Sequence, residues 1–180
     1  MNRRNWMIAA GLLLALPGMA LAGKKPGYLS VTESVEINAS PAKVWNLVKN
    51  WNGLHKWHPA FSNAEIKSGE NNKRGAVRTL TMAGGGAQFD EELDGFSEKN
   101  RKYSYRIISD SPLPVVDYSS TILVKSGKVK GTSVLVWKGK FMRKVADNPP
   151  AGQDDAGAKK TIIGAYQAGL QNVKKLAETM

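Results

Sequence analysis

The chain contains no cysteine, and this absence excludes a disulfide framework, a thiolate metal site and a cysteine nucleophile. It has two histidines, His55 and His58, whose i, i+3 spacing can place both on one helical turn. Two ligands do not make a metal site, so we predict structural or surface roles for both and expect no metal and no cofactor. The three glycines at 84–86 are not a phosphate-binding loop, because no Lys followed by Ser or Thr comes after them. A Gly-x-Ser-x-Gly elbow and a recognisable catalytic triad are also lacking.

Long apolar stretches are lacking apart from one short run at the N-terminus. Arg3 and Arg4 precede this run at 7–16, and Ala20-Leu21-Ala22 follows with the small-x-small pattern of a cleavage site. The run is too short to span a bilayer comfortably. We predict a signal peptide at 1–22, a single domain at 23–180, a periplasmic location and no stable membrane span after cleavage. An uncleaved membrane anchor is the alternative, and the Arg pair leaves both Sec and twin-arginine export open.

Acidic residues are few relative to basic ones. The chain has 26 Lys and Arg against 15 Asp and Glu, a net charge of +11. Without Arg3 and Arg4 the predicted mature chain has 24 basic and 15 acidic residues, which gives +9. Such a charge steers association with acidic partners or membrane surfaces. The chain has no nucleic-acid-binding motif, so we expect no nucleic-acid partner.

Most of the chain up to residue 143 has the pattern of strands and turns. Residues 28–38 alternate apolar and polar side chains, as a half-buried strand does. Ser40 and Pro41 then predict a helix start, because Ser caps a helix and Pro suits its first position. A second short helical turn is predicted at 54–57. Six more strands follow, and their short connections indicate an antiparallel meander: 64–68, 76–82, 88–96, 102–109, 115–125 and 130–143.

The last element is predicted as a helix from about residue 158 to 178. Its apolar face recurs at helical spacing through Ile162, Ile163, Tyr166, Leu170, Val173 and Leu176. A helix of this length measures about 30 Å, enough to cross a sheet. Gly164 and Gly169 weaken it, and they either allow close approach to the sheet or leave room for a ligand. We therefore predict an α+β fold: a curved antiparallel sheet of six to seven strands wrapped around one long C-terminal helix, with two short helices after the first strand.

Short pieces of the sequence occur in an order that resembles a known superfamily. They are Ile37–Trp45, Trp57–Pro59, Gly75–Leu80, Glu92–Asp94, Tyr105–Ile107, Pro112–Pro114 and Tyr118–Ser120. Together they resemble the START/Bet v 1-like superfamily, also called SRPBCC, which includes polyketide cyclase-like proteins. The resemblance covers about residues 31–176 and implies the helix-grip fold, with a ligand cavity between sheet and helix.

Within that superfamily, a small basic protein with a signal peptide is similar to the MxaD-like periplasmic proteins. This finer resemblance implies a role in methanol oxidation, as an accessory of methanol dehydrogenase and its cytochrome c. A basic protein would suit an acidic cytochrome c.

A more distant resemblance is to the plant abscisic acid receptors. Their pocket lysine falls on Lys67 and their pocket glutamate on Glu91. Their gate and latch loops match 82–87 and 110–116, although the gate residues and the latch His-Arg are lacking here. The resemblance implies two mobile loops at a cavity mouth, without hormone-type gating.

Strand alternation gives the candidate site residues. Glu91 lies between Phe89 and Leu93 on one face of its strand, so burial would demand a partner or a raised pKa, and we propose Lys67 as that partner. Tyrosines and one serine on neighbouring strands would add an apolar wall with a few polar groups. The predicted ligand-binding set is Lys67, Phe89, Glu91, Tyr105, Tyr118, Ser120, Trp137, Ile163, Tyr166 and Leu170. The alternatives are that Glu91 and Lys67 are two surface charges at strand ends, and that the aromatic and apolar residues simply fill the core.

Three functional hypotheses follow. The first is a non-catalytic periplasmic accessory protein that binds a partner, a small hydrophobic ligand, or both. The second is a cyclase-like or lyase enzyme with Glu91 as general base and Lys67 or Tyr118 polarising a carbonyl. The third is a carrier of lipids or hydrophobic metabolites.

Overall fold

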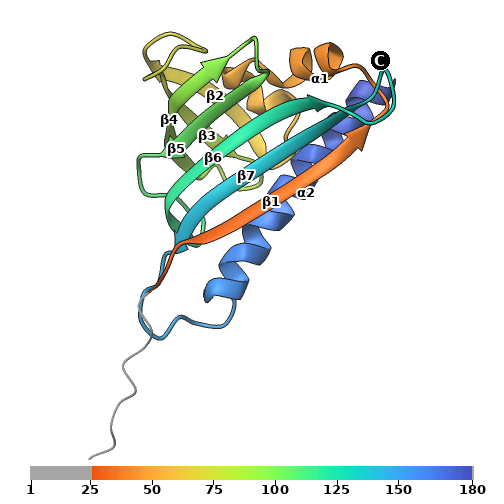
Figure 1. Cartoon of the computed structure of the whole chain (residues 1–180). Helices are drawn as coiled ribbons and strands as arrows, with labels where there is room; N and C mark the ends of the chain where they lie inside the picture. The colour runs from red at the N-terminus through yellow and green to blue at the C-terminus, as the bar shows by residue number, and fades with distance from the viewer. Residues whose placement is uncertain (1–25, 180) are drawn as a thin grey trace, which may run out of the picture.

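Seven antiparallel strands form one sheet in the order β1-β7-β6-β5-β4-β3-β2 (Figure 1). The computed structural model describes residues 26–179. The strands are β1 (Leu29–Ile37), β2 (Phe61–Ser68), β3 (Val77–Met82), β4 (Gln88–Ser97), β5 (Lys102–Ile107), β6 (Val115–Ser126) and β7 (Ser133–Arg143). The helices are α1 (Pro41–Val48), the short 3₁₀ helix η1 (Trp51–Lys56) and α2 (Asp155–Thr179). Consecutive strands from β2 to β7 are neighbours, and β1 closes the order beside β7.

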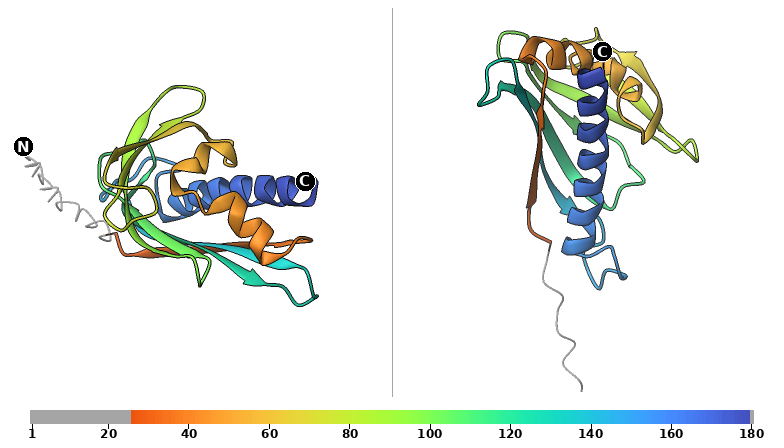
Figure 2. Two further views of the ribbon diagram at one scale, coloured as in Figure 1. Left: turned by 90° about the horizontal axis from the view of Figure 1, so that it is seen from above. Right: turned by 90° about the vertical axis from the view of Figure 1, so that its right-hand side faces the viewer.

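The sheet is strongly curved, and α2 lies along its concave side while α1 and η1 cover one end (Figure 2). The helix packs mainly against β1, β7 and α1. Inward side chains of the strands and the apolar stripe of α2 together form one core. This arrangement encloses the space in which a candidate site has to lie.

The short helix α1 begins as the sequence predicts. The Ser40 side-chain oxygen accepts a hydrogen bond from the Lys43 backbone N–H at 3.3 Å, and Pro41 occupies the first helical position. Val44 and Val48 are fully buried on its inner face. The helix is thereby fixed over the end of the sheet.

The long helix α2 begins at Asp155, three residues before the predicted start. The Asp154 carboxylate caps it by accepting a hydrogen bond from the Gly157 N–H at 2.7 Å. Arg143 at the end of β7 reaches Asp155 at 2.7 Å. The polar composition of residues 147–157, with two prolines and two glycines, predicts a loop. The cap at Asp154 shows why the helix nevertheless begins within this segment.

Gly169 marks a close approach of α2 to the sheet side of the core. A Cβ at this position would lie 2.6 Å from His58 Cδ2 and 2.8 Å from a ring carbon of Trp137. A Cβ at Gly164, in the same helix, would meet no atom within 4 Å. Of the two roles that the sequence left open, Gly169 therefore serves close approach, whereas Gly164 faces open space.

Substituting the two glycines is expected to change stability in opposite directions. Gly164→Ala should stabilise the protein by about 1 kcal/mol, because alanine is the better helix former and meets no neighbour. Gly169→Ala should destabilise it by about 1–3 kcal/mol, since two rigid buried rings must move. Urea unfolding of both variants beside wild type measures the difference. Equal effects at the two positions would contradict the close packing at Gly169.

The predicted architecture is confirmed in its element order, its seven strands, its two short helices and its long C-terminal helix. The predicted signal peptide at 1–22 lies outside the described residues. Within residues 26–179, no helix is both long enough and apolar enough to cross a membrane.

Candidate functional site

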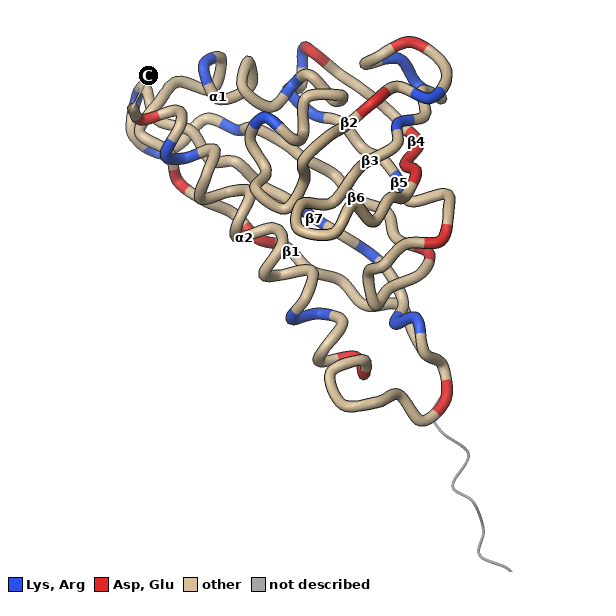
Figure 3. The backbone as a smooth tube through the Cα atoms, turned by 180° about the vertical axis from the view of Figure 1, so that it is seen from behind, with Lys and Arg blue, Asp and Glu red and all other residues tan. Residues whose placement is uncertain are grey.

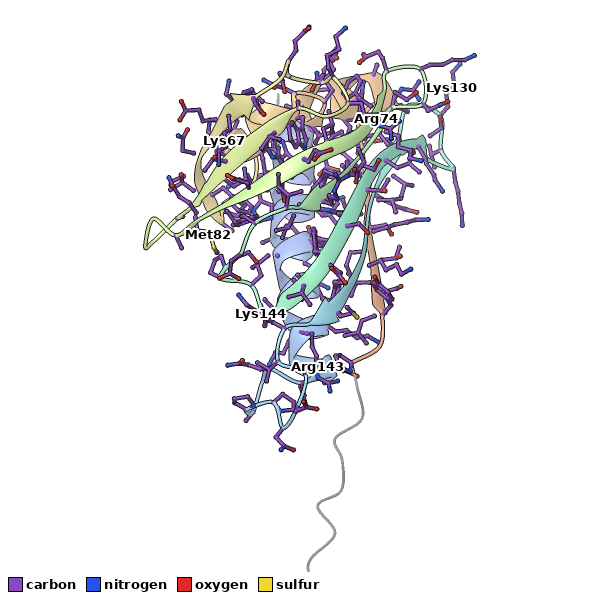
Figure 4. All side chains as sticks on the ribbon, turned by 90° about the vertical axis from the view of Figure 1, so that its left-hand side faces the viewer. Lys67, Arg74, Met82, Lys130, Arg143 and Lys144 are labelled. Atoms are coloured by element: carbon purple, nitrogen blue, oxygen red, sulfur yellow. The ribbon has the colours of Figure 1, made fainter. Side chains whose placement is uncertain are left out.

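A small cavity of about 60 Å³ lies between α2 and the inner face of the sheet. Its wall is mostly apolar and aromatic: Leu54, Ala60, Phe61, Met82, Phe89, Tyr105, Ile107, Leu113, Tyr118, Trp137, Ile162, Ala165 and Tyr166, with His58 and Glu91 as further polar members. Met82, Ile107 and Leu113 are only half-buried and form the outer part of this wall. Met82 ends β3 beside the β3–β4 turn (Figure 4). The cavity thus meets the surface between that turn and the loop before β6.

Glu91 is paired with a buried arginine. Arg78 Nε and Nη2 both donate to Glu91 Oε2, at 2.9 and 2.6 Å. Arg78 Nη1 donates to the Trp51 carbonyl, and the guanidinium lies 4.4 Å from the centroid of the Trp51 ring. Both members of the pair are almost completely buried. The second carboxylate oxygen, Glu91 Oε1, has no hydrogen bond among the described residues.

Burial dominates the electrostatics of Glu91. Removal from water raises the pKa of the Glu91 carboxyl, and the nearby Arg78 charge and its hydrogen bonds only partly oppose this effect. Arg78 therefore stabilises the charged form of Glu91, which burial disfavours.

Three polar side chains and one backbone carbonyl form a hydrogen-bonded chain at the back of the cavity. Tyr118 and Tyr166 hydroxyls lie 2.7 Å apart, and Tyr166 lies 2.9 Å from Ser120 Oγ. Ser120 donates to the Lys138 carbonyl at 2.8 Å. Because that carbonyl can only accept, Tyr166 must donate to Ser120 and Tyr118 must donate to Tyr166. The direction of the whole chain is thereby fixed.

Trp137 holds this chain against the sheet. Its Nε1–H donates to Ser120 Oγ at 2.8 Å and to the Tyr105 hydroxyl at 3.1 Å. Its ring stacks on Tyr166 with centroids 4.4 Å apart. Gly139 on β7 makes this possible, because a Cβ there would collide with the Tyr166 hydroxyl. Burial raises the pKa of Tyr105 and Tyr118 well above the usual value, so both phenols stay neutral.

His58 is a buried, neutral member of the cavity wall. Its Nδ1 accepts the Ala60 N–H at 3.1 Å, so Nε2 carries the proton and donates to the Ala165 carbonyl at 3.0 Å. Burial lowers the pKa of His58 to about 4, although its backbone hydrogen bonds partly oppose this. Both ring nitrogens are thus used: Nε2 joins the segment after η1 to α2, and Nδ1 holds the turn at Ala60. Residues 26–179 contain no group of three or more His, Asp or Glu arranged to hold a metal.

Comparison with known proteins identifies the chain's relatives. Residues 28–178 match the family described as polyketide cyclase/dehydrase and lipid transport. The chain belongs to this family. It is thus a member of the START/Bet v 1-like superfamily, as the sequence predicted.

Solved structures of similar proteins agree with this assignment. The protein XoxI of Bacillus cereus is 32% identical with a TM-score of 0.71, over 82% of this chain and 94% of that one. A Bacillus thuringiensis protein is also 32% identical, with a TM-score of 0.70 over 82% and 98% of the two chains. The Zhui aromatase/cyclase of a Streptomyces species shares the fold at 20% identity, with a TM-score of 0.67 over 84% and 94%.

The structure brings many of the predicted site residues of this polyketide cyclase-family chain together. Six of them line the cavity: Phe89, Glu91, Tyr105, Tyr118, Trp137 and Tyr166. Ser120 lies behind the wall, bonded to Tyr166. Ile163 and Leu170 are outside it, because the helix turns Ile162, Ala165 and Tyr166 toward the space instead. That the cavity residues bind a ligand stays a prediction.

Lys67 does not reach the cavity, contrary to the sequence prediction. Its Nζ pairs with Asp90 at 2.6 Å, and its side chain is 60% exposed. Ala64 and Ile66 on β2 face inward. Because successive side chains of a strand point to opposite faces, Lys67, the next residue after Ile66, faces outward. Figure 4 shows Lys67 on this strand at the side of the sheet. The partner of Glu91 is Arg78, across the β3–β4 pairing at the register Arg78↔Glu91.

Two residues of the site, Arg78 and His58, were missed from the sequence. Arg78 shares a face with the buried Ala76 and Leu80, and this alternation was a usable signal for an inward arginine. His58 was predicted only as structural or surface. Its position gives no periodic signal, because it lies two residues after the end of the short helix η1, in a turn of the chain.

Proposed function

We propose that this chain is a non-catalytic, exported binding protein that takes a small, mainly apolar molecule into the cavity under α2. The observation that carries this proposal is the wall itself. It is aromatic and aliphatic, and most of its polar atoms are already bonded to one another. Such a wall offers a ligand apolar contact and very few specific polar contacts, which is typical of a binding pocket.

The size of the cavity restricts the ligand. A volume of about 60 Å³ is well below the roughly 150 Å³ of an engineered cavity that binds benzene. A ring-sized ligand therefore has to displace side chains, and the half-buried residues Met82, Ile107 and Leu113 stand at the surface side. Methionine adapts readily, since it has three rotatable bonds and a polarisable sulfur. A long acyl chain needs far more space, which favours a compact ligand over a lipid.

Binding is favoured over cyclase-like or lyase chemistry because the predicted catalytic group does not assemble. Lys67 is outside the cavity, Glu91 is held by Arg78, and Tyr118 donates its proton to Tyr166. Neither of the two proposed carbonyl-polarising groups is therefore available, and Glu91 would have to supply the chemistry alone.

The binding proposal is tested with toluene as probe. We expect toluene to shift the amide NMR signals of β4, β5 and β7 around the cavity in wild type. Ala165→Leu places extra carbons in the cavity and should abolish these shifts. The control Ala168→Leu, on an exposed position of the same helix, should retain them. Absence of toluene binding to wild type, or its persistence in Ala165→Leu, would contradict the proposal.

A second candidate function, docking on an acidic partner, is favoured by the distribution of charge. We define the turn end as the end of the sheet with the β2–β3, β4–β5 and β6–β7 turns, α1 and the last turns of α2. Its basic residues are Lys43, Lys49, Lys73, Arg74, Lys99, Arg101, Lys102, Lys125, Lys128, Lys130, Lys174 and Lys175, and its acidic residues are Glu36, Glu70, Glu98 and Glu178. The remaining charged residues within 26–179 include nearly equal numbers of basic and acidic side chains, so their charges nearly cancel. The excess of positive charge therefore lies at one end of the molecule (Figure 3).

We propose methanol dehydrogenase and its acidic cytochrome c as the partners that the turn end would meet in the periplasm. The proposal depends on the sequence resemblance to MxaD-like proteins, and the charged end supplies its physical basis. Arg74 and Lys130 lie at this end, whereas Arg143 and Lys144 lie at the opposite one (Figure 4).

Charge reversal at the two ends separates this proposal from a general effect of net charge. We expect binding of the purified dehydrogenase or cytochrome at low salt, and a loss of binding at high salt. Lys128→Glu with Lys130→Glu should weaken binding, whereas Lys159→Glu with Lys160→Glu, at the far end of α2, should change it little. Equal weakening by both double variants, or no binding to either protein, would overturn the docking proposal.

A further inference from the structure

We propose that the cavity selects a compact apolar molecule carrying one neutral hydroxyl group and rejects carboxylates. This inference rests on the proposed binding function and names the ligand chemistry of the same site. It follows from counting which hydrogen-bonding positions of the wall are still open.

Glu91 supplies an open acceptor. Both hydrogen bonds from Arg78 go to Oε2, and Oε1 is without a hydrogen bond among the described residues. Because this oxygen belongs to a carboxylate that lines the cavity, it accepts a hydrogen bond from a ligand O–H in a charge-assisted way. Such hydrogen bonds are roughly twice as strong as neutral ones.

The hydroxyl groups of the wall have their protons committed. Tyr105 accepts the Trp137 Nε1–H at 3.1 Å and is also hydrogen-bonded to Ser120. Because the Ser120 proton goes to the Lys138 carbonyl, the bond between Tyr105 and Ser120 uses the Tyr105 proton. The protons of Tyr118 and Tyr166 are committed along the directed chain that ends at the same carbonyl. The open position of the wall is therefore the acceptor Glu91 Oε1.

The open acceptor lies beside the aromatic part of the wall. Glu91 pairs with Ile107 and Leu93 pairs with Tyr105 across β4 and β5, so Glu91 and Tyr105 are diagonal neighbours on the inner face. Arg78 lies over the Tyr105 ring while it binds Glu91, with 5.5 Å from its guanidinium carbon to the ring centroid. A ligand hydroxyl can donate to Glu91 Oε1, which an ether cannot do.

Anionic ligands find no free positive charge in this wall. Arg78 is turned to Glu91 and to the Trp51 carbonyl and does not line the cavity. His58 is neutral and uses both ring nitrogens. Lys67 is outside. A carboxylate ligand would thus be buried beside the Glu91 carboxylate without a compensating cation, which is strongly unfavourable.

Four ring probes of similar size test the inference in wild-type protein at pH 7: toluene, anisole, phenol and benzoate. Binding is followed by the cavity amide signals in NMR titrations. We expect phenol to bind about tenfold tighter than toluene or more, as a hydrogen bond to a charged group implies. Anisole, which accepts but cannot donate, should stay near toluene, and benzoate should bind more weakly than toluene.

A double variant tests whether Glu91 causes the preference for phenol over toluene. Arg78→Leu combined with Glu91→Leu removes the pair without leaving a lone charge, and it should reduce the phenol preference over toluene to about twofold or less. The wild-type series decides the question even if this variant does not fold. Equal affinity for toluene and phenol, or benzoate binding as tight as phenol, would overturn the inference while cavity binding stands. Failure of every probe would overturn both proposals.

Discussion

Arg78→Leu is expected to destabilise the protein by about 3–5 kcal/mol at pH 7, because it leaves the Glu91 carboxylate buried without its partner. Both side chains are nearly inaccessible, so water cannot replace the lost hydrogen bonds. Without Arg78 the burial effect on Glu91 is unopposed, and the pKa of that carboxyl rises further. The destabilisation should therefore be larger at pH 8 than at pH 5, where the carboxyl can be protonated. Urea unfolding at both pH values measures the effect.

The double variant Arg78→Leu with Glu91→Leu is the matched control. Replacing a whole buried ion pair with apolar residues is often neutral in stability, so the double variant should recover most of the loss. Its stability should also lose the pH dependence of the single variant. If the single variant were as stable as wild type, the buried Glu91 carboxylate would not need Arg78 as its partner, contrary to this description.

Acidification from pH 6.5 to pH 4 is expected to cost about 3 kcal/mol of stability through His58 alone. The unfolded chain takes up a proton on this histidine near its ordinary pKa of 6.5, whereas the folded protein does so only near its lowered pKa of about 4. The contribution of His58 is thus fully present above pH 6.5 and is lost as the pH falls, by about 1.4 kcal/mol per pH unit. Chemical unfolding at several pH values gives this slope.

Variants separate the effect of His58 on the pH dependence of stability from the effect of Glu91. The raised pKa of Glu91 acts in the opposite sense, since it favours the folded state as the pH falls toward 4.5. His58→Gln should flatten the slope between pH 6.5 and 4, at the cost of lower stability at pH 7. His55→Gln, at the other histidine, should keep the wild-type slope. A wild-type slope that survives in His58→Gln would refute the assignment.

The fold was predictable because its signals are local and periodic. Ser40-Pro41 gives a helix start, the alternation at 29–37 gives a strand, and the spacing of Ile162, Tyr166 and Val173 gives the inner face of α2. The start of α2 was missed because its cap, Asp154, lies in a segment whose composition is typical of a loop.

The site was predictable only in part, because it depends on pairing between distant strands. The inward position of Glu91 follows from its own strand, but its partner is set by the register between β3 and β4. Lys67 and Arg78 are both basic and lie on the neighbouring strands β2 and β3. They are distinguished only by strand alternation: Arg78 points to the same face as the buried Leu80, whereas Lys67 points to the face opposite the buried Ala64. The size of the cavity depends on how Trp137, Tyr166 and His58 fit together in three dimensions, and no sequence pattern reports that fit.

The position of β1 at the edge beside β7 has a consequence for how the molecule is made. Val35 pairs with Leu135, one hundred positions later in the chain. At a synthesis rate of roughly 5–20 residues per second, about 5–20 s pass between the synthesis of β1 and that of β7, its neighbour in the described sheet. Such non-local pairing also slows the folding of a completed chain. A nascent chain of this topology stays incompletely folded until its last third has emerged, and we expect ribosome-bound chains ending before residue 133 to be sensitive to protease.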